Sequence, residues 1–330
     1  MVRVVLALFI ASTVVVAQER RKATPLPDEM VLAAQVMLDV AGFSPGEIDG
    51  KPGTNFGRAA AAYQESRGLS VSGKVDDATL DRLRQDFRSQ PPVISYTITD
   101  ADIAGPFQPD IPKDMIAQSK LPSLDYRNAL ELIAEKFHAS PALLGSLNPG
   151  QTFMEAGAQV TVPNVAPLEP LPPPAETKPS AAAKPSAPAN TKPSGVRIVV
   201  TKKISALTVE DADGRVLFFA PVTTGSQHDP LPIGKWKVTG VQQMPVFNYN
   251  PGLFWDASPK HSKAKIPAGP NNPVGIAWID LSKPHYGIHG TPEPSQIGHV
   301  QSHGCVRMTN WDVRRVMEWA KPGTLVVFQP

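Results

Sequence analysis

The sequence contains a single cysteine among 330 residues, so no intramolecular disulfide can form. The sequence also lacks a large net charge, because its 32 basic and 30 acidic side chains leave only +2. Without a basic field, nucleic-acid binding has no electrostatic basis, and we expect no nucleic-acid partner. No apolar run approaches the roughly 20 residues that a helix needs to cross a bilayer, which argues against a permanent membrane anchor.

The N-terminal segment has the pattern of a signal peptide. Arg3 precedes an apolar stretch of about 13 residues, and Ala17 follows before the charged run 19–22. The sequence therefore predicts residues 1–17 as a signal peptide and an exported, periplasmic protein. A lone thiol in an oxidising compartment is either an inert core residue or a functional one, and the neighbours of Cys305 decide between the two.

Proline is abundant, with 36 residues against a usual share of about 5%. Residues 166–195 include three consecutive prolines, 172–174, and three Lys-Pro-Ser units. Such a segment cannot build a core, and in the polyproline II conformation it forms a semi-rigid spacer. The sequence predicts a linker here, with anchoring modules before it and a separate domain after it.

Residues 28–88 carry the pattern of three short helices. Apolar residues at helical spacing lead to a turn at 44–46, a second helix covers 59–63, and a third starts at Asp76. The segment resembles the three-helix peptidoglycan-binding domain, although Phe56 stands where that family usually has Thr; an ordinary three-helix bundle is the alternative. The residues that carry the resemblance are Gln35, Leu38, Gly42, Asp49, Gly50, Gly53, Ala59, Tyr63, Gln64, Gly68, Leu69, Gly73, Asp76, Thr79 and Leu80.

Residues 94–165 are similar to a LysM glycan-binding module. A strand at 96–98, helical patterns at 129–138 and 143–148, and a strand at 160–163 carry the resemblance. Ala101 and Ile103 depart from the family pattern, and an insertion at 105–123 separates the first strand from the first long helix. The resemblance implies either a working glycan-binding module or a degenerate one that keeps only its packing.

Residues 196–330 show short β-rich runs separated by turns, which predict a mainly β sandwich or barrel with one or two helices. A hairpin turn is expected at Asp213-Gly214, and a helix at 311–320 with Thr309 or Asn310 as its cap. The predicted strands are 196–201, 206–210, 216–223, 235–241, 275–280, 286–289 and 325–328.

Cys305 lies in the motif Ser-His-Gly-Cys-Val-Arg (302–307), and His289-Gly290-Thr291 lies upstream. A thiol becomes a nucleophile only as the thiolate, so it needs an imidazole or a cation nearby. Glycine next to the nucleophile lets the backbone approach a substrate, and successive N–H groups there can bind a developing oxyanion. These residues suit acyl transfer.

The two motifs resemble the catalytic signature of L,D-transpeptidases of the YkuD type, over essentially all of residues 196–329. The resemblance implies that Cys305 attacks the carbonyl of the third stem residue of peptidoglycan, meso-diaminopimelate, releases D-alanine and forms a thioester. An acceptor amine then takes the acyl group: another stem in a 3-3 cross-link, a lysine of an outer-membrane lipoprotein, or a D-amino acid. It also implies inhibition by carbapenems and no cofactor. No metal is expected, because a metal on Cys305 would quench the nucleophile.

The resemblance assigns a role to each residue of the site. His289 is the base, and the carbonyl of Gly290 orients it. The N–H groups of His303, Gly304 and Cys305 form the oxyanion hole. Ser302 and Arg307 hold the site or contact substrate, and Tyr286 and Trp278 line the donor groove or pack in the core. The remaining histidines, His228, His261, His285 and His299, are expected to be solvated.

Two alternatives stay open. An L,D-carboxypeptidase or amidase uses the same residues with water as the acceptor. A non-catalytic wall-binding scaffold belongs to another class and would be favoured by the absence of Cys305 or His289, but both are present.

Overall fold

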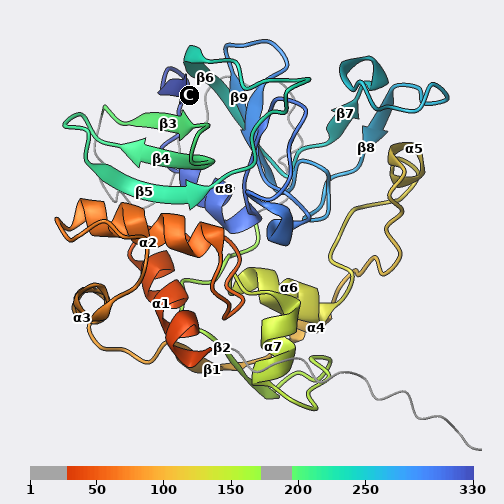
Figure 1. Ribbon diagram of the computed structural model, residues 1–330. Helices are drawn as coiled ribbons and strands as arrows, with labels where there is room; N and C mark the ends of the chain where they lie inside the picture. The colour runs from red at the N-terminus through yellow and green to blue at the C-terminus, as the bar shows by residue number, and fades with distance from the viewer. Residues whose placement is uncertain (1–27, 172–194) are drawn as a thin grey trace, which may run out of the picture.

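The computed structural model describes residues 28–171 and 195–330. The predicted signal peptide, and all of the predicted linker but its two ends, lie outside the described residues. Figure 1 shows a mainly β part, built from the C-terminal residues, packed on two smaller N-terminal modules. None of the helices in the described ranges has the length and apolar character needed to span a membrane.

The first module (residues 28–88) is helical, as predicted. Asp28 caps its first helix by accepting from the backbone N–H groups of Met30 and Val31, and Asp76 caps the third by accepting from Thr79 N at 2.9 Å. Its helices are α1 (Glu29–Val40), α2 (Thr54–Ser66) and α3 (Asp77–Asp86).

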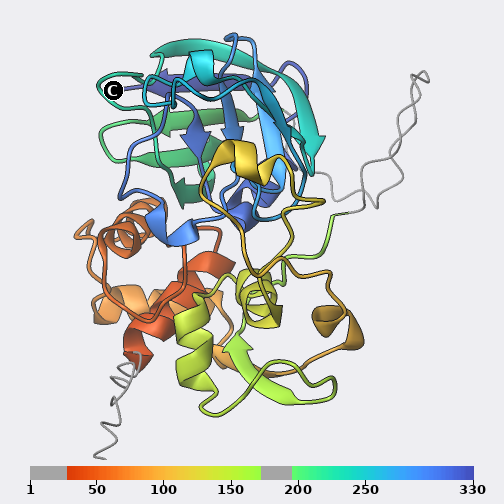
Figure 2. The same ribbon diagram turned by 90° about the vertical axis from the view of Figure 1, so that its right-hand side faces the viewer.

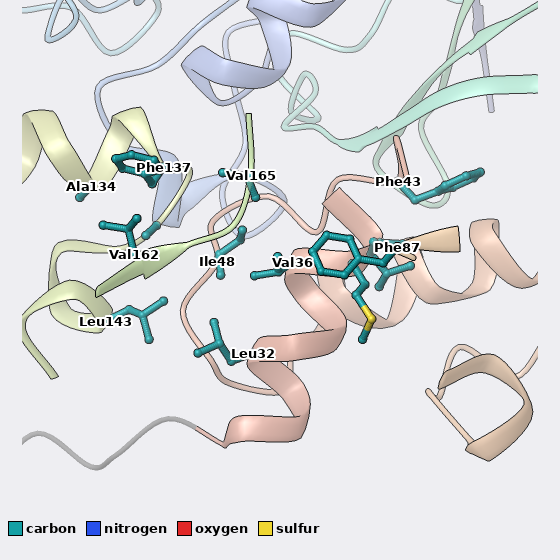
Figure 3. Close-up of a cluster of buried hydrophobic side chains, with 14 of the residues drawn as sticks. Leu32, Val36, Phe43, Ile48, Phe87, Ala134, Phe137, Leu143, Val162 and Val165 are labelled. Atoms are coloured by element: carbon teal, nitrogen blue, oxygen red, sulfur yellow. The ribbon is translucent and has the colours of Figure 1, made fainter. Parts of the chain in front are cut away.

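The second module (residues 93–165) has two antiparallel strands with helices between them. Its core is continuous with that of the first module: Figure 3 shows Leu32 and Ile48 of the first module near Leu143 and Val162 of the second. The elements are β1 (Val93–Thr97), α4 (Asp100–Ile103), α5 (Met115–Gln118), α6 (Ala129–Lys136), α7 (Pro141–Leu147) and β2 (Gln159–Pro163).

The C-terminal part is one curled sheet of eight strands in the order β11-β10-β9-β6-β12-β3-β4-β5. The pairs β12–β3 and β10–β11 are parallel and the others antiparallel. These strands are β3 (Arg197–Thr201), β4 (Ala206–Glu210), β5 (Val216–Pro221), β6 (Gly234–Gln243), β9 (Ala277–Leu281), β10 (Gly287–His289), β11 (Val306–Arg307) and β12 (Leu325–Gln329).

A small hairpin and three short helical segments complete this part. The hairpin of β7 (Phe247–Tyr249) and β8 (Ala264–Ile266) forms a separate two-stranded sheet. The helical segments are the 3-10 turns η1 (Pro251–Leu253) and η2 (Pro294–Gln296), and the helix α8 (Asn310–Val316). The mainly β prediction is confirmed, as a single curled sheet.

Local details differ from the predictions in two places. Helix α8 is capped by Thr309, whose side chain accepts from Asp312 N, but it ends at Val316 and not at Ala320. The strands β7, β8 and β11 are missing from the prediction because two or three residues are too few to show an alternating pattern. The expected hairpin turn at Asp213-Gly214 is present, closed by Asp211 N donating to Arg215 O at 3.0 Å.

The N-terminal modules pack directly against the C-terminal part, a contact that the sequence does not predict. Phe219 of β5 belongs to the core of the N-terminal modules, and its N–H donates to Gly42 O at 2.9 Å. Asp39 of α1 accepts from Arg315 Nη2 of α8 at 2.7 Å. His138 of the second module lies 3.2 Å from the same carboxylate. Three segments that are distant in sequence therefore meet at one buried ion-pair cluster.

Candidate active site

The pairing of β10 and β11 places Cys305 and His289 on adjacent strands. Ile288 lies opposite Val306 and His289 opposite Arg307, so Cys305, just before β11, lies level with Gly287, two residues before His289. Both residues line a cavity of about 1130 Å³. Ligand pockets are commonly about 300–1,000 Å³, so this cavity has room for a peptide substrate.

The backbone fixes the tautomer of His289. Its Nδ1 lies 2.7 Å from the carbonyl oxygen of Gly290, and a carbonyl can only accept, so Nδ1 carries the proton and Nε2 keeps a lone pair. The ring stacks on Trp278 with centroids 5.4 Å apart. Burial, helped by the charge of Arg307, lowers the pKa of His289 to about 3. The imidazole is therefore neutral at pH 7 and available as a base.

The thiol of Cys305 is also neutral at rest. Burial raises the pKa of Cys305 to about 11, although a backbone hydrogen bond from Gly287 and the charge of Arg307 act in the opposite direction. A thiol beside a neutral imidazole differs from the preformed thiolate–imidazolium pair of some cysteine enzymes. The thiol donates to the carbonyl oxygen of His285, with Sγ 3.7 Å from that oxygen. A neutral thiol must lose its proton as it attacks a carbonyl carbon.

The turn before Cys305 presents free backbone donors. Ser302 Oγ donates to Cys305 O at 2.6 Å, and Ser302 N donates to Thr224 O at 3.0 Å, which fixes the turn. Within the described ranges, the N–H groups of His303, Gly304 and Cys305 have no hydrogen-bond acceptor. Gly304 has φ +102°, and a Cβ there would lie 2.8 Å from the Tyr286 ring, so only glycine fits.

The structure brings all the predicted side chains to one cavity. Trp278, Tyr286, His289, Ser302, His303, Cys305 and Arg307 all line it. Trp278 and Tyr286 are thus at the groove and not in the core. Arg307 keeps its Nε buried and, among the described residues, without a partner. The catalytic and binding roles assigned to these residues stay predictions. The described residues contain no group of three or more His, Cys, Asp or Glu side chains arranged to hold a metal ion.

Asn310 holds the backbone next to His289, and no sequence motif indicated this role. Its Oδ1 accepts from Thr291 N and from Ile276 N, each at 3.2 Å, and its Nδ2 donates to Glu135 Oε1 at 3.0 Å. A Cβ on Gly290 would lie 2.2 Å from Asn310 Oδ1, so the side chain touches the backbone that orients His289. The sequence pattern offered Asn310 only as a helix cap, and that cap is Thr309.

Residues 245–266, called the flap, form another side of the cavity. The flap contains His261, for which the expectation of a solvated side chain is wrong. His261 Nδ1 lies 2.9 Å from Tyr249 OH, and its Nε2 lies 2.8 Å from Asp114 Oδ2 of the second module. The other three histidines expected to be solvated, His228, His285 and His299, are exposed. No local pattern reveals the His261 contact, because Asp114 is far away in sequence.

A neutral histidine, a cysteine and free backbone donors lie in one cavity of a β-sheet domain, an arrangement that suits cysteine acyl transfer. Comparison with known proteins narrows this class. Residues 195–328 match the YkuD family model, described as "L,D-transpeptidase catalytic domain", and residues 27–83 match a model described as "Putative peptidoglycan binding domain". Neither match includes the second module, whose likeness to LysM stays a prediction.

Curated relatives agree with these matches. The chain is 28% identical over 200 residues to the Bacillus subtilis "Putative L,D-transpeptidase YkuD", covering 60% of this chain and 92% of that protein. It is 30% identical over 144 residues to the Bacillus subtilis "Putative L,D-transpeptidase YqjB", covering 42% of this chain and 73% of that protein. The chain therefore belongs to the L,D-transpeptidase family.

Other matches are partial. A Bacillus licheniformis relative described as "Putative L,D-transpeptidase YkuD" is 49% identical over 61 residues, which are 18% of this chain and 37% of that protein. A solved L,D-transpeptidase from Mycobacterium smegmatis has a TM-score of 0.34 and 19% identity, covering 41% of this chain and 58% of its own. L,D-transpeptidase 3 from Mycobacterium tuberculosis, with a faropenem-derived adduct, has a TM-score of 0.34 and 16% identity, covering 41% and 60%.

Proposed function

We propose that this protein is a peptidoglycan L,D-transpeptidase with Cys305 as its nucleophile. The observation that carries the proposal is the hydrogen bond of 2.7 Å from His289 Nδ1 to Gly290 O, which leaves Nε2 as a free base in the cavity that holds Cys305. Membership of the family supplies the substrate class, the stem peptide of peptidoglycan.

Acylation uses the groups already described. The Cys305 sulfur attacks the carbonyl carbon of the third stem residue while His289 Nε2 takes the thiol proton. The N–H groups of His303, Gly304 and Cys305 stabilise the oxyanion of the tetrahedral intermediate. The bond to D-alanine then breaks, the leaving amine takes the proton from His289, and a thioester remains on Cys305.

Deacylation reverses the proton transfers with a new amine. His289 Nε2 takes a proton from the acceptor amine as its nitrogen attacks the thioester carbonyl, and the sulfur leaves as the thiol. A second stem gives a 3-3 cross-link, a lipoprotein lysine gives an anchored protein, and a D-amino acid gives an exchanged terminus. Water would instead give a tripeptide, which is the carboxypeptidase outcome.

The rest of the chain suits work at the cell wall. The first module supports binding to peptidoglycan, and the LysM-like second module would add a glycan contact. The proposal includes export to the periplasm by the predicted signal peptide, residues 1–17. Carbapenems, whose strained ring carbonyl is open to attack by a thiol, are expected to acylate Cys305.

The experiment is mass spectrometry of the products formed from a diaminopimelate-containing tetrapeptide muropeptide, with and without an added D-amino acid. A cross-linked dimer or a D-amino-acid adduct, absent with Cys305→Ala, is expected. Tripeptide and free D-alanine alone would identify a carboxypeptidase. No product from the wild-type protein, with Cys305 unreacted, would contradict the proposal and favour a binding scaffold.

A further inference from the structure

The insertion in the second module, residues 105–123, packs against the flap. Met115, Ile116 and Leu121 of the insertion lie against an apolar cluster formed by Leu124, Tyr249 and Ile266. Figure 1 shows α5 beside β8, and Figure 2, turned by 90°, shows the same short helix in front of the β-sheet part. A segment of the second module therefore packs against the flap.

Backbone contacts fix this segment on the catalytic domain. Leu124 N donates to Ala268 O at 3.0 Å, and Asn271 N donates to Leu124 O at 2.9 Å. At Gly269 a Cβ would lie 2.1 Å from Leu124 O, so the close approach requires glycine there. The backbone at Leu124, just after the insertion, is thus hydrogen-bonded to Ala268 and Asn271 of the catalytic domain.

Polar contacts hold the flap on two sides. On the outer side, Asp114 Oδ2 pairs with His261 Nε2 at 2.8 Å. On the inner side, Asp256 Oδ1 pairs with His303 Nε2 at 2.8 Å, and His303 lies in the turn that carries Cys305. The flap therefore contacts both the second module and the turn that carries Cys305.

Three residues of the insertion also reach the cavity itself. Lys113, Asp114 and Met115 line it together with His289 and Cys305. Asp114 is engaged by His261, whereas Lys113 is exposed and makes no ion pair with any described residue. Its ammonium group is free for an anion in the cavity.

We propose that Lys113, Asp114 and Met115 form one wall of the substrate groove, so that the second module determines how the substrate binds. Lys113 binds a carboxylate of the substrate, and Asp114 positions the flap through His261. The identity of that carboxylate rests on the proposed function: a stem peptide has carboxylates on its terminal residue and on the diaminopimelate side chain.

The first test compares Lys113→Gln with Lys120→Gln, a matched change on the same insertion outside the cavity. With tetrapeptide as donor, Lys113→Gln is expected to raise KM about threefold or more with little change in kcat, as the loss of one exposed charge contact predicts. Equal KM values for the two variants would overturn the role of Lys113.

A second readout does not depend on the proposed function. Lys113 should favour alkylation of Cys305 by anionic iodoacetate over neutral iodoacetamide, so Lys113→Gln is expected to lower the ratio of the two rates about twofold or more. If the wild-type protein fails to process tetrapeptide while Lys113→Gln still lowers this ratio, the result contradicts the proposed function and supports the role of Lys113 in the groove wall. An unchanged ratio in Lys113→Gln would contradict the proposal that Lys113 forms part of the groove wall.

The role of Asp114 is tested by hydrogen exchange of residues 245–266. Asp114→Asn is expected to speed exchange across the flap, while Asp110→Asn, on an exposed position of the same insertion, leaves it unchanged. Identical exchange in the two variants would show that the Asp114–His261 pair does not hold the flap.

Discussion

Cys305 and His289 are both uncharged in the resting site, and this sets how the chemistry begins. The same burial acts on both: it raises the pKa of the thiol to about 11 and lowers the pKa of the imidazole to about 3. A preformed ion pair would require the opposite shifts. In the proposed mechanism, proton transfer to Nε2 is therefore coupled to the attack, and the resting thiol reacts more slowly with oxidants than a thiolate would.

The thiol pKa predicts the pH dependence of alkylation. Because only the thiolate reacts, the rate of Cys305 with iodoacetamide is expected to rise about tenfold per pH unit between roughly pH 6 and pH 9. Mass spectrometry of the modified protein at each pH measures this rate, with Cys305→Ala as the blank. A rate that is already constant above about pH 5 would show a thiolate–imidazolium pair instead.

Replacing His289 tests the base directly. His289→Ala is expected to lower the rate of acylation by tetrapeptide at least about a hundredfold, the usual contribution of general-base catalysis. The matched control is His299→Ala, an exposed histidine nearby in sequence that does not line the cavity. Turnover of His289→Ala within a few fold of the wild type would remove His289 from the mechanism.

At the scale of elements, the long strands and the helices of the first module were predictable. Strand β4 and the helices α1 to α3 follow apolar patterns in the sequence, and α1 and α3 begin at the capping side chains Asp28 and Asp76. The flap strands and β11 were not predictable, because they are short and depend on tertiary contacts. The motif around Cys305 revealed the site, while the flap that forms another side of it has no motif.

Helix α8 supports the catalytic loop through Asn310, which predicts an effect on kcat. Asn310→Ala removes the acceptor for Thr291 N and Ile276 N and leaves Glu135 with one donor fewer. We expect a kcat lowered about tenfold or more with a small change in KM, and a loss of about 1–3 kcal/mol in the free energy of unfolding.

Steady-state kinetics on tetrapeptide and urea unfolding measure the two effects of Asn310→Ala. Asn164→Ala is the matched control, since that exposed amide donates only to Pro91 O at 2.9 Å. A variant that loses stability but keeps its kcat would show that Asn310 is purely structural and does not position the loop of His289.

For the whole molecule, the sequence predicted the parts but not their contact. Asp39, His138 and Arg315 belong to three separate segments, and each alone has the pattern of an ordinary helix or turn residue. Their meeting depends on how the surfaces of the modules fit, which no local pattern encodes. A proline-rich linker permits the domains to lie apart but does not enforce it.

Arg315 is expected to stabilise the assembled molecule. Arg315→Ala leaves Asp39, which is fully buried, with His138 as its remaining partner, and breaking such a buried pair costs about 3–5 kcal/mol. Arg197→Ala, which breaks an exposed pair with Glu210, should cost less than about 1 kcal/mol. Urea unfolding of both variants measures the difference, and equal losses would show that the module contact adds little stability.

Glu135, at the contact between the second module and the catalytic domain, makes the free energy of unfolding depend on pH. Burial raises the pKa of Glu135 from its ordinary 4.5 to about 8, against the hydrogen bonds from Asn310 and Tyr126. The folded protein therefore keeps a proton that the unfolded chain releases above pH 4.5, so stability falls as the pH rises from about 4.5 to about 8. Asp312, with a pKa raised to about 7, acts in the same direction.

The change Glu135→Gln tests this coupling, because the amide cannot ionise while it keeps the shape of the side chain. We expect the free energy of unfolding of the wild type to fall by a few kcal/mol between pH 5 and pH 8, at about 1.4 kcal/mol per unit of pKa shift. In Glu135→Gln the share of that fall that comes from Glu135 should disappear, while Asp312 keeps its share. The exposed control Glu65→Gln should keep the whole fall. A slope that is unchanged in Glu135→Gln would mean that the carboxyl is ionised in the folded protein, held by Asn310 and Tyr126 as a charged contact between the modules.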